Sequence, residues 1–173
     1  SLGVALVPVE SPDEAELVFI NTCAFIQPAT EESVRTIAQA IADIEELPKR
    51  PLLAVAGCLV GRYHAEDLAP ELPEVDLWLD NSDLEAWPAM LARKLGLPEP
   101  TVPGRILSTG PSYAWLKISD GCRHACSFCA IPNIRGGHRS HCKDMIVREA
   151  RALLDQGVKE LNLVAQDLTE WGC

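Results

Sequence analysis

The chain is organised around the stretch Asp120-Gly121-Cys122-Arg123-His124-Ala125-Cys126-Ser127-Phe128-Cys129-Ala130-Ile131-Pro132. Its three cysteines follow the pattern C-x3-C-x2-C. Thiolates are soft ligands that select iron–sulfur clusters, zinc or copper(I). Three thiolates on one loop can hold three irons of a four-iron cluster and leave the fourth iron open to a substrate or cofactor. The stretch therefore predicts a metal or cluster site that can also bind a small molecule.

The cysteines outside this stretch do not suggest disulfides. The chain has an odd number of cysteines, 7 in all, and no visible secretion signal, so clustered thiols indicate metal binding or catalysis. We expect a cytoplasmic protein. The chain starts at Ser1 and not at Met, from which we expect it to lie inside a longer gene product. The longest apolar run, residues 52–60, is too short to cross a bilayer and is typical of a buried strand, so no membrane partner is expected.

Charge is distributed unevenly along the chain, which has a net charge of -10. Residues 1–100 hold 6 Lys and Arg against 18 Asp and Glu, whereas residues 101–173 hold 9 against 7, so the two parts carry -12 and +2. An acidic surface repels the phosphates of nucleic acids and attracts basic partners. The simpler interpretation, a well-solvated surface, stays open.

The first hundred residues alternate between predicted strands and helices. Strands are predicted at 4–9, 17–20, 52–56 and 75–79, with a turn at 11–14. Helices are predicted at 30–47, at 63–72 with an interruption or end near Pro70, and at 82–95 with Ser82 as N-cap and Glu85 completing a capping box. This alternation is typical of βαβ units and a parallel, Rossmann-like sheet.

Two cysteines stand directly after predicted strands. Cys23 follows the strand at 17–20 and Cys58 follows the strand at 52–56. Ligands of parallel sheets gather at the carboxyl ends of the strands, so the two thiols could share one edge as a second candidate site. Alternatively, both are small buried residues of the core.

Proline and glycine dominate residues 98–111, which we interpret as a linker between a first domain at 1–97 and a second part at 112–173. The second part predicts a strand at 113–119, the cysteine loop, a helix capped by Asp144 and ended by Gly157, and a strand at 161–165. In that first strand, Trp115 and Lys117 would share one face. This order is that of the opening of a β/α barrel, with cysteines where barrels place their chemistry. About sixty residues cannot close such a barrel, so the chain looks truncated at both ends.

The motifs resemble those of the radical S-adenosylmethionine (SAM) methylthiotransferases. The resemblance covers nearly the whole chain, and the motifs that carry it are Asn21-Thr22-Cys23-Ala24-Phe25-Ile26, Gly57-Cys58-Leu59, Gly121 to Pro132, Arg135-Gly136, residues 157–161 and Gln166-Asp167. Within the family, four features are more similar to the branch that modifies a ribosomal protein than to the tRNA branch, namely Phe25-Ile26, Glu32-Ser33, residues 73–76 and His124.

This resemblance implies cofactors, site residues and partners. Cys122, Cys126 and Cys129 would hold a 4Fe–4S cluster that binds and cleaves SAM, with Phe128 and Gln166 near the SAM. An aromatic residue of the barrel core is the alternative for Phe128. Cys23 and Cys58 would hold a second 4Fe–4S cluster with a third cysteine upstream of Ser1.

The implied product is a methylthio group on the β-carbon of an aspartate in a small-subunit ribosomal protein. The implied electron donor is of the flavodoxin or ferredoxin type. RNA contact would come through a C-terminal domain that this chain lacks, and the fragment alone would be inactive. The sulfur source and the oligomeric state do not follow from the sequence.

The chain departs from the family pattern in three places. Cys142 and Cys173 match no family ligand position and are interpreted as surface or packing thiols. His141 stands where the family usually has a second arginine after Arg139-Ser140, which weakens one basic contact.

Two other functions compete with this one. The chain could be a tRNA adenosine methylthiotransferase, which the acidic first part disfavours. It could also be a zinc-binding interaction module completed by His64, His124, His138 or His141, although zinc ribbons favour paired C-x2-C knuckles, and no second knuckle is present.

Overall fold

The structure is a computed structural model that describes residues 7–98, 105, 107, 110 and 112–172. The chain divides into two compact units, and the division lies between residues 104 and 105. Within the described residues, no helix combines the length and the hydrophobicity that crossing a membrane requires.

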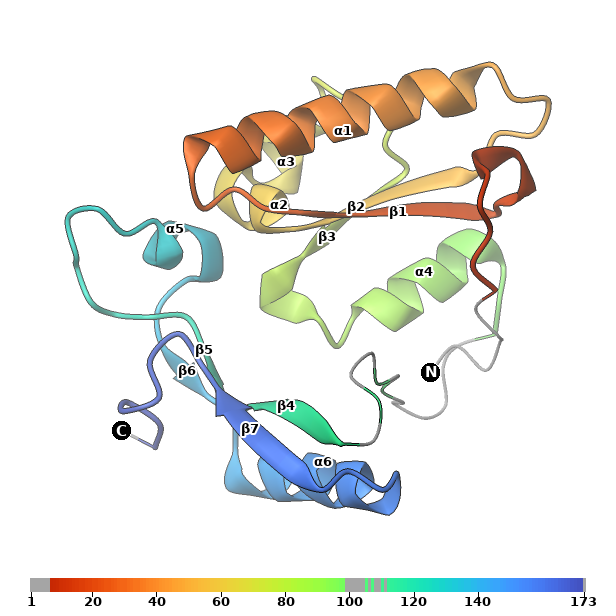
Figure 1. Cartoon of the computed structure of the whole chain (residues 1–173). Coiled ribbons are helices and arrows are strands. Elements are labelled where there is room, and N and C mark those ends of the chain that lie inside the picture. The colour runs from red at the N-terminus through yellow and green to blue at the C-terminus, as the bar shows by residue number, and fades with distance from the viewer. Residues whose placement is uncertain (1–6, 99–104, 106, 108–109, 111, 173) are drawn as a thin grey trace. The chain divides into compact units, whose positions relative to one another are not determined.

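The first unit is built on a three-stranded parallel sheet in the order β1-β2-β3 (Figure 1). Its strands are β1 (Leu17–Thr22), β2 (Leu52–Gly57) and β3 (Leu77–Asp80). The register pairs Thr22 with Gly57 and Gly57 with Asp80, so the carboxyl ends of all three strands lie level. The predicted parallel α/β sheet is therefore present, with the central strand almost wholly buried, as its apolar sequence indicates.

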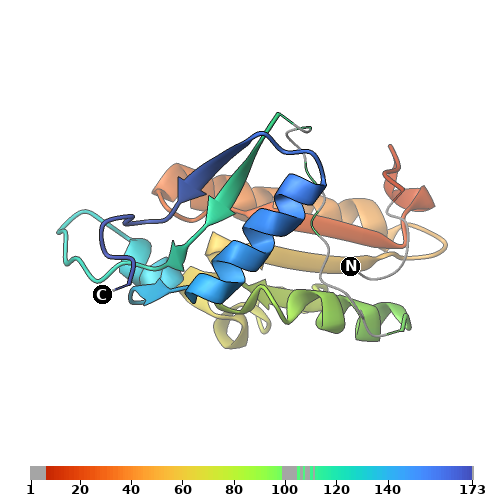
Figure 2. The ribbon, with the colours of Figure 1, turned by 90° about the horizontal axis from the view of Figure 1, so that it is seen from below.

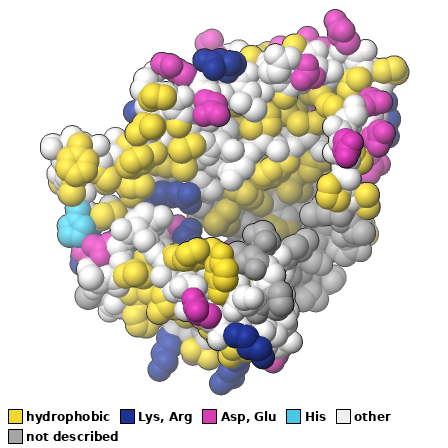
Figure 3. Space-filling view, viewed as in Figure 1, with side chains coloured by type: hydrophobic (Ala, Val, Ile, Leu, Met, Phe, Trp, Pro, Cys, Tyr) yellow, Lys and Arg dark blue, Asp and Glu magenta, His cyan; other side chains and the backbone are white. Residues whose placement is uncertain are grey.

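Helices cover both faces of this sheet (Figures 1 and 2). They are α1 (Gln27–Glu45), α2 (Cys58–Tyr63), α3 (Ala65–Leu68) and α4 (Trp87–Leu95), with 3-10 turns at Pro12–Glu14 and Asn81–Asp83. On one face, Ile37 of α1 and Leu59 of α2 pack with Leu53. On the other, residues of α4 pack on Ala54, Ala56 and Leu79. Burial of each large apolar side chain stabilises the fold by about 1.5–3 kcal/mol. On the surface, acidic side chains stand out over α1 (Figure 3).

Several sequence predictions for the first unit are wrong in detail. The predicted helix at 63–72 is two short helices that begin at Cys58 and break at His64, whose φ of 59° interrupts helical geometry. Residues 7–9 of the predicted strand at 4–9 are not in a strand, and residues 4–6 lie outside the described residues. Helix α1 begins three residues before Thr30, with Pro28 in its first turn, where the missing N–H costs nothing.

The predicted cap at Ser82 is also wrong. The side chain of Asp80 accepts the N–H of Ser82 at 2.7 Å and forms a 3-10 turn there, and α4 starts only at Trp87. Pro88 lies in its first turn, a position that favours proline. Asp80, the last residue of β3, is therefore the N-cap of the turn at residues 81–83.

The second unit pairs β4 (Tyr113–Lys117) with β7 (Glu160–Val164) in parallel. Helix α6 (Lys143–Asp155) joins them as a β-α-β unit and packs on one face, where Ala114, Leu116, Leu153 and Val158 form the core (Figure 2). The predicted alternation of β4 is confirmed, since Ala114 and Leu116 are buried and Trp115 is exposed.

Three features of this unit differ from the sequence predictions. A short antiparallel pair, β5 (Ser119–Asp120) with β6 (Arg139–Ser140), and the helix α5 (Ile131–Arg135) were not expected. The N-cap of α6 is Cys142, and Asp144 lies inside the first turn, where its charge still favours the helix N-terminus.

Candidate metal centres

The first candidate site lies at the carboxyl edge of the first sheet. Thr22 pairs with Gly57 at the carboxyl ends of β1 and β2, and Cys23 and Cys58 directly follow these two residues. Adjacent strands lie about 4.8 Å apart, so the chain path brings the two thiols to one place on the edge. Cys23 is exposed and Cys58 is half-buried, which disfavours the alternative that both are core residues.

Backbone contacts fix this edge. Gly57 has φ of 104°, a conformation that favours glycine, and a Cβ there would lie 2.4 Å from the carbonyl oxygen of Thr22. The Ser33 hydroxyl accepts the N–H of Cys23 at 3.1 Å and donates to its carbonyl oxygen at 2.8 Å. The glycine before Cys58 is thus required by the close approach of the two strands.

The buried side chain of Thr22 links both strands to α2. Its Oγ1 donates to the carbonyl of Ala56 at 2.6 Å and accepts the N–H of Leu59 at 3.1 Å. Leu59 lies in the first turn of α2, where backbone N–H groups lack partners within the helix. The hydroxyl therefore caps the helix that begins with Cys58.

Thr22→Val should destabilise the first unit by about 2 kcal/mol, because it leaves the buried N–H of Leu59 without an acceptor. Urea unfolding of the chain, followed by circular dichroism, measures this change. Thr36→Val is the matched control, since the Thr36 hydroxyl bonds to Glu32 on the exposed side of α1, and should cost less than about 0.5 kcal/mol. Equal losses in the two variants would contradict the capping role of Thr22.

The second candidate site is the loop with the C-x3-C-x2-C pattern, which follows β5. Cys122 donates its N–H to the carbonyl of Gly136 at 3.2 Å, and Cys129 donates its N–H to the carbonyl of Cys126 at 3.1 Å. Cys126 is exposed, and Cys122 and Cys129 are half-buried. The loop thus presents three thiols without disulfides on a short, turned backbone.

The donor set of this loop fits an iron–sulfur cluster. Cys122, Cys126 and Cys129 offer three thiolates, each of which can bind one iron of a four-iron cluster. All-thiolate ligands are those that iron–sulfur clusters use.

A buried carboxylate anchors the start of this loop. Asp120 forms an ion pair with Lys117 on one oxygen, and its other oxygen accepts Nε2 of His141 at 3.2 Å. Burial alone would raise the pKa of Asp120, but the hydrogen bond and charge of Lys117, followed by those of His141, outweigh burial and leave that pKa lowered. His141, which the sequence offered as a zinc ligand, instead holds this carboxylate.

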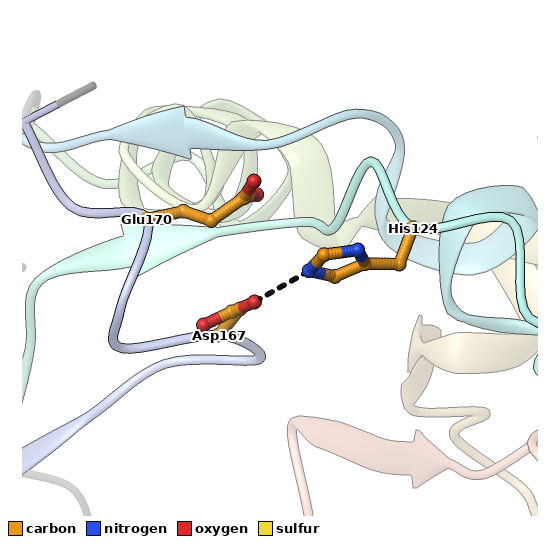
Figure 4. A group of neighbouring side chains, drawn as sticks. All are labelled: His124, Asp167 and Glu170. Carbon is orange, nitrogen blue, oxygen red and sulfur yellow. Dashed lines mark hydrogen bonds and ion pairs between the residues drawn. The ribbon is translucent and has the colours of Figure 1, made fainter.

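The end of β7 contributes two acids that the sequence analysis did not identify as contacts of the loop (Figure 4). His124 Nε2 donates to Asp167 Oδ2 at 2.8 Å, and Arg123 Nε donates to Glu170 Oε1 at 2.6 Å. Hydrogen bonds from the Thr169 hydroxyl, from His124 and from the Thr169 backbone lower the pKa of Asp167 to about 2. These contacts could have been expected from the β-α-β order, because the parallel pairing of β4 and β7 brings the segments that follow these strands together.

The remaining predicted site residues lie apart from these contacts. Phe128 is 89% exposed, so it is not packed in the core of the described unit. Gln166 is exposed next to Asp167. Cys142 is exposed at the start of α6, as a surface thiol would be, and Cys173 lies outside the described residues.

Comparison with known proteins identifies similar sequences. Residues 3–80 match the model of the uncharacterized protein family UPF0004. The chain is 69% identical over 172 residues to "Ribosomal protein uS12 methylthiotransferase RimO" of Nitratidesulfovibrio vulgaris (strain DP4), a match that covers 99% of the chain and 40% of that protein. It is 61% identical to the protein of the same name in Oleidesulfovibrio alaskensis, over 99% of the chain and 40% of the relative.

A third relative of that name, in Lawsonia intracellularis, is 55% identical over 99% of the chain and 39% of its own length. The chain thus spans about two fifths of the length of the curated relatives that it matches. Over nearly every residue of its sequence, this chain is similar to the corresponding part of these proteins named RimO.

Proposed function

We propose that this chain forms the cluster-binding part of a radical SAM methylthiotransferase that adds a methylthio group to the β-carbon of an aspartate in ribosomal protein uS12. The observation that carries the proposal is the arrangement of the cysteines. Cys23 and Cys58 share one sheet edge, and a separate loop carries C-x3-C-x2-C, in a chain up to 69% identical to proteins named for this reaction.

The proposed ligands divide between the two units. Cys122, Cys126 and Cys129 would hold a 4Fe–4S cluster, and Cys23 and Cys58 would hold a second one with a further cysteine upstream. When bound, the first cluster supplies the electron that cleaves SAM, which is the difficult chemistry. The chain's own residues bind and orient these groups, and Phe128 and Gln166 are proposed to lie near SAM because both are exposed, one on the cysteine loop and one beside its acidic contacts.

We further propose that residues 1–97 are the methylthiotransferase N-terminal domain, that residues 98–111 are a linker, and that residues 112–173 begin a radical SAM barrel. The parallel β-α-β unit of β4, α6 and β7, with the cysteine loop directly after β5, supports the barrel. The proposed partners are uS12 as substrate and an electron donor of the flavodoxin or ferredoxin type. RNA contact would belong to a C-terminal domain, and the proposed location is the cytoplasm.

The proposal is tested by expressing the full-length protein in a host that lacks its own RimO and the tRNA enzyme MiaB. Mass spectrometry of uS12 should show the mass of one methylthio group in place of a hydrogen on the target aspartate, and the tRNA adenosine should stay unmodified. Vector alone is the control. Modification of tRNA with unmodified uS12 would reject the uS12 assignment. Stoichiometric zinc with no uptake of iron would reject the enzyme in favour of a zinc module.

A further inference from the structure

The turn that follows β7 makes side-chain hydrogen bonds with the cysteine loop. The register pairs Lys117 with Val164 at the carboxyl ends of β4 and β7. The N–H of Ile118 donates to the carbonyl oxygen of Val164 at 3.1 Å. The chain leaves both strands side by side. The loop with the three cysteines and the turn at residues 167–172 therefore emerge as neighbours.

Two consecutive residues between the first two cysteines contact this turn. Arg123 Nε donates to Glu170 Oε1 at 2.6 Å. His124 Nε2 donates to Asp167 Oδ2 at 2.8 Å, the bond that Figure 4 shows. The acids are the less exposed partners, since 17% of the Asp167 side chain and 13% of the Glu170 side chain are exposed, against more than half of each basic side chain. The acids are thus the fixed side of each pair.

The turn itself is held from several directions. Asp167 Oδ1 accepts the N–H and the hydroxyl of Thr169 at 2.8 and 2.6 Å. Trp171 Nε1 donates to the carbonyl of His141 at 3.1 Å, and the N–H of Gly172 donates to the hydroxyl of Ser140 at 2.9 Å. These bonds connect the turn to the strand β6, which pairs with β5 directly before Cys122.

We propose that Asp167 and Glu170 are positioning residues that hold the C-x3-C-x2-C loop in its ligand-presenting conformation before metal arrives. This inference rests on the proposed function, because it concerns the cluster that Cys122, Cys126 and Cys129 would hold. The acids act on the thiols through Arg123 and His124, which follow Cys122 in sequence and precede Cys126. Positioned ligands lose less conformational entropy when the cluster forms.

The same side chains could be read as a cation site, since the ligand atoms of His124, Asp167 and Glu170 lie within 4.8 Å of one another. The contacts disfavour that reading. Arg123 already places a positive charge on Glu170, and Asp167 already accepts hydrogen bonds from Thr169. A divalent ion would have to displace or repel these donors, whereas a positioning role uses them as they stand.

The test uses the full-length protein with Asp167→Asn or Glu170→Gln. In the metal-free, reduced protein under argon, the alkylation rate of Cys126 by iodoacetamide should rise about fivefold, the scale expected when a charge-assisted bond that orders a loop is lost. In each pair the basic side chain is more than half exposed, so the pair contributes little to global stability and the unfolding temperature should stay close to wild type. Glu160→Gln, at the opposite end of β7, is the matched control and should leave the rate unchanged.

Two further measurements separate positioning from a general structural effect. Exchanging the charges in Arg123→Glu with Glu170→Arg should restore slow alkylation. After reconstitution in a Cys23→Ala, Cys58→Ala background, Asp167→Asn should alter the EPR line shape of the reduced cluster at Cys122, Cys126 and Cys129. Both readouts differ from the uS12 assay, so the inference can fail while the proposed function holds.

Two results would overturn the positioning role. One is an alkylation rate at Cys126 that neither Asp167→Asn nor Glu170→Gln changes. The other is stoichiometric binding of Mn²⁺ or Zn²⁺ to a protein with Cys122, Cys126 and Cys129 replaced by alanine, when Glu170→Gln abolishes that binding. The second result would identify a cation site at His124, Asp167 and Glu170.

Discussion

Replacing Gly121 with alanine in the full-length protein should abolish iron–sulfur loading of the C-x3-C-x2-C loop. Gly121 has φ of 71°, and a Cβ there would lie 2.2 Å from the carbonyl oxygen of Gly137 and 2.6 Å from that of Gly136. These are backbone atoms, and the Gly136 carbonyl also accepts the N–H of Cys122. Relief of the clash must therefore move the first cysteine of the loop.

The expected cost combines backbone strain and overlap. A non-glycine residue at positive φ costs about 1–3 kcal/mol, and overpacking against atoms that cannot move adds about 1–3 kcal/mol. We expect the free energy of unfolding of the second unit to fall by about 3 kcal/mol or more. Iron and sulfide content after anaerobic reconstitution, with thermal unfolding of the same samples, measures both effects.

The neighbouring glycines provide a graded control. Gly136 has φ of 74° but no atom within 4 Å of a Cβ, so Gly136→Ala isolates the backbone strain. Gly137 has neither a positive φ nor a close atom, so Gly137→Ala should behave like wild type. If all three variants load the same amount of iron, the close approach at Gly121 does not determine the shape of the loop.

The same physical reason explains why a glycine precedes the cysteine at both candidate sites. Gly57 and Gly121 each have positive φ and each face the backbone of a neighbouring segment where a Cβ would lie. The sequence shows the Gly-Cys pairs, but the requirement for glycine depends on segments that are distant in sequence. Only the fold reveals which atoms occupy the space.

Local patterns predicted the framework well. The apolar run of β2, the spacing of Ile37, Ile41 and Ile44 in α1, and the alternation in β4 each reflect burial of one side or of the whole element. The placement of Cys23 and Cys58 at one edge also followed from the β/α order, and the register confirms it. That these cysteines hold a cluster stays a prediction.

Boundaries and long-range contacts could not be predicted in the same way. Helix α2 starts at Cys58 because Gly57 turns sharply and Thr22 caps it from another strand. The capping box at Ser82 failed because the Asp80 side chain accepts the Ser82 N–H that Glu85 would accept in such a box. The bond between His124 and Asp167 joins residues 43 positions apart, and it depends on the pairing of β4 with β7.

Cys126→Ala should remove SAM cleavage by the full-length protein and leave the first unit folded. Cys126 is the exposed, central cysteine of the loop, and its carbonyl accepts the N–H of Cys129, a backbone contact that alanine can keep. Changes to residues that only support metal ligands typically cost about 10–100-fold. Loss of a ligand should therefore reduce 5′-deoxyadenosine formation by more than about 100-fold.

The matched control for this variant is Cys142→Ala. Cys142 is also exposed in the second unit, and its side chain makes no capping bond at the start of α6, so 5′-deoxyadenosine should form at the wild-type rate. Circular dichroism and residual iron at Cys23 and Cys58 test whether the first unit stays intact in both variants. Each of the two substitutions removes one exposed thiol. A difference in 5′-deoxyadenosine formation between them therefore reports ligation and not the loss of a cysteine as such. Normal 5′-deoxyadenosine formation by Cys126→Ala would show that the cluster ligands lie elsewhere.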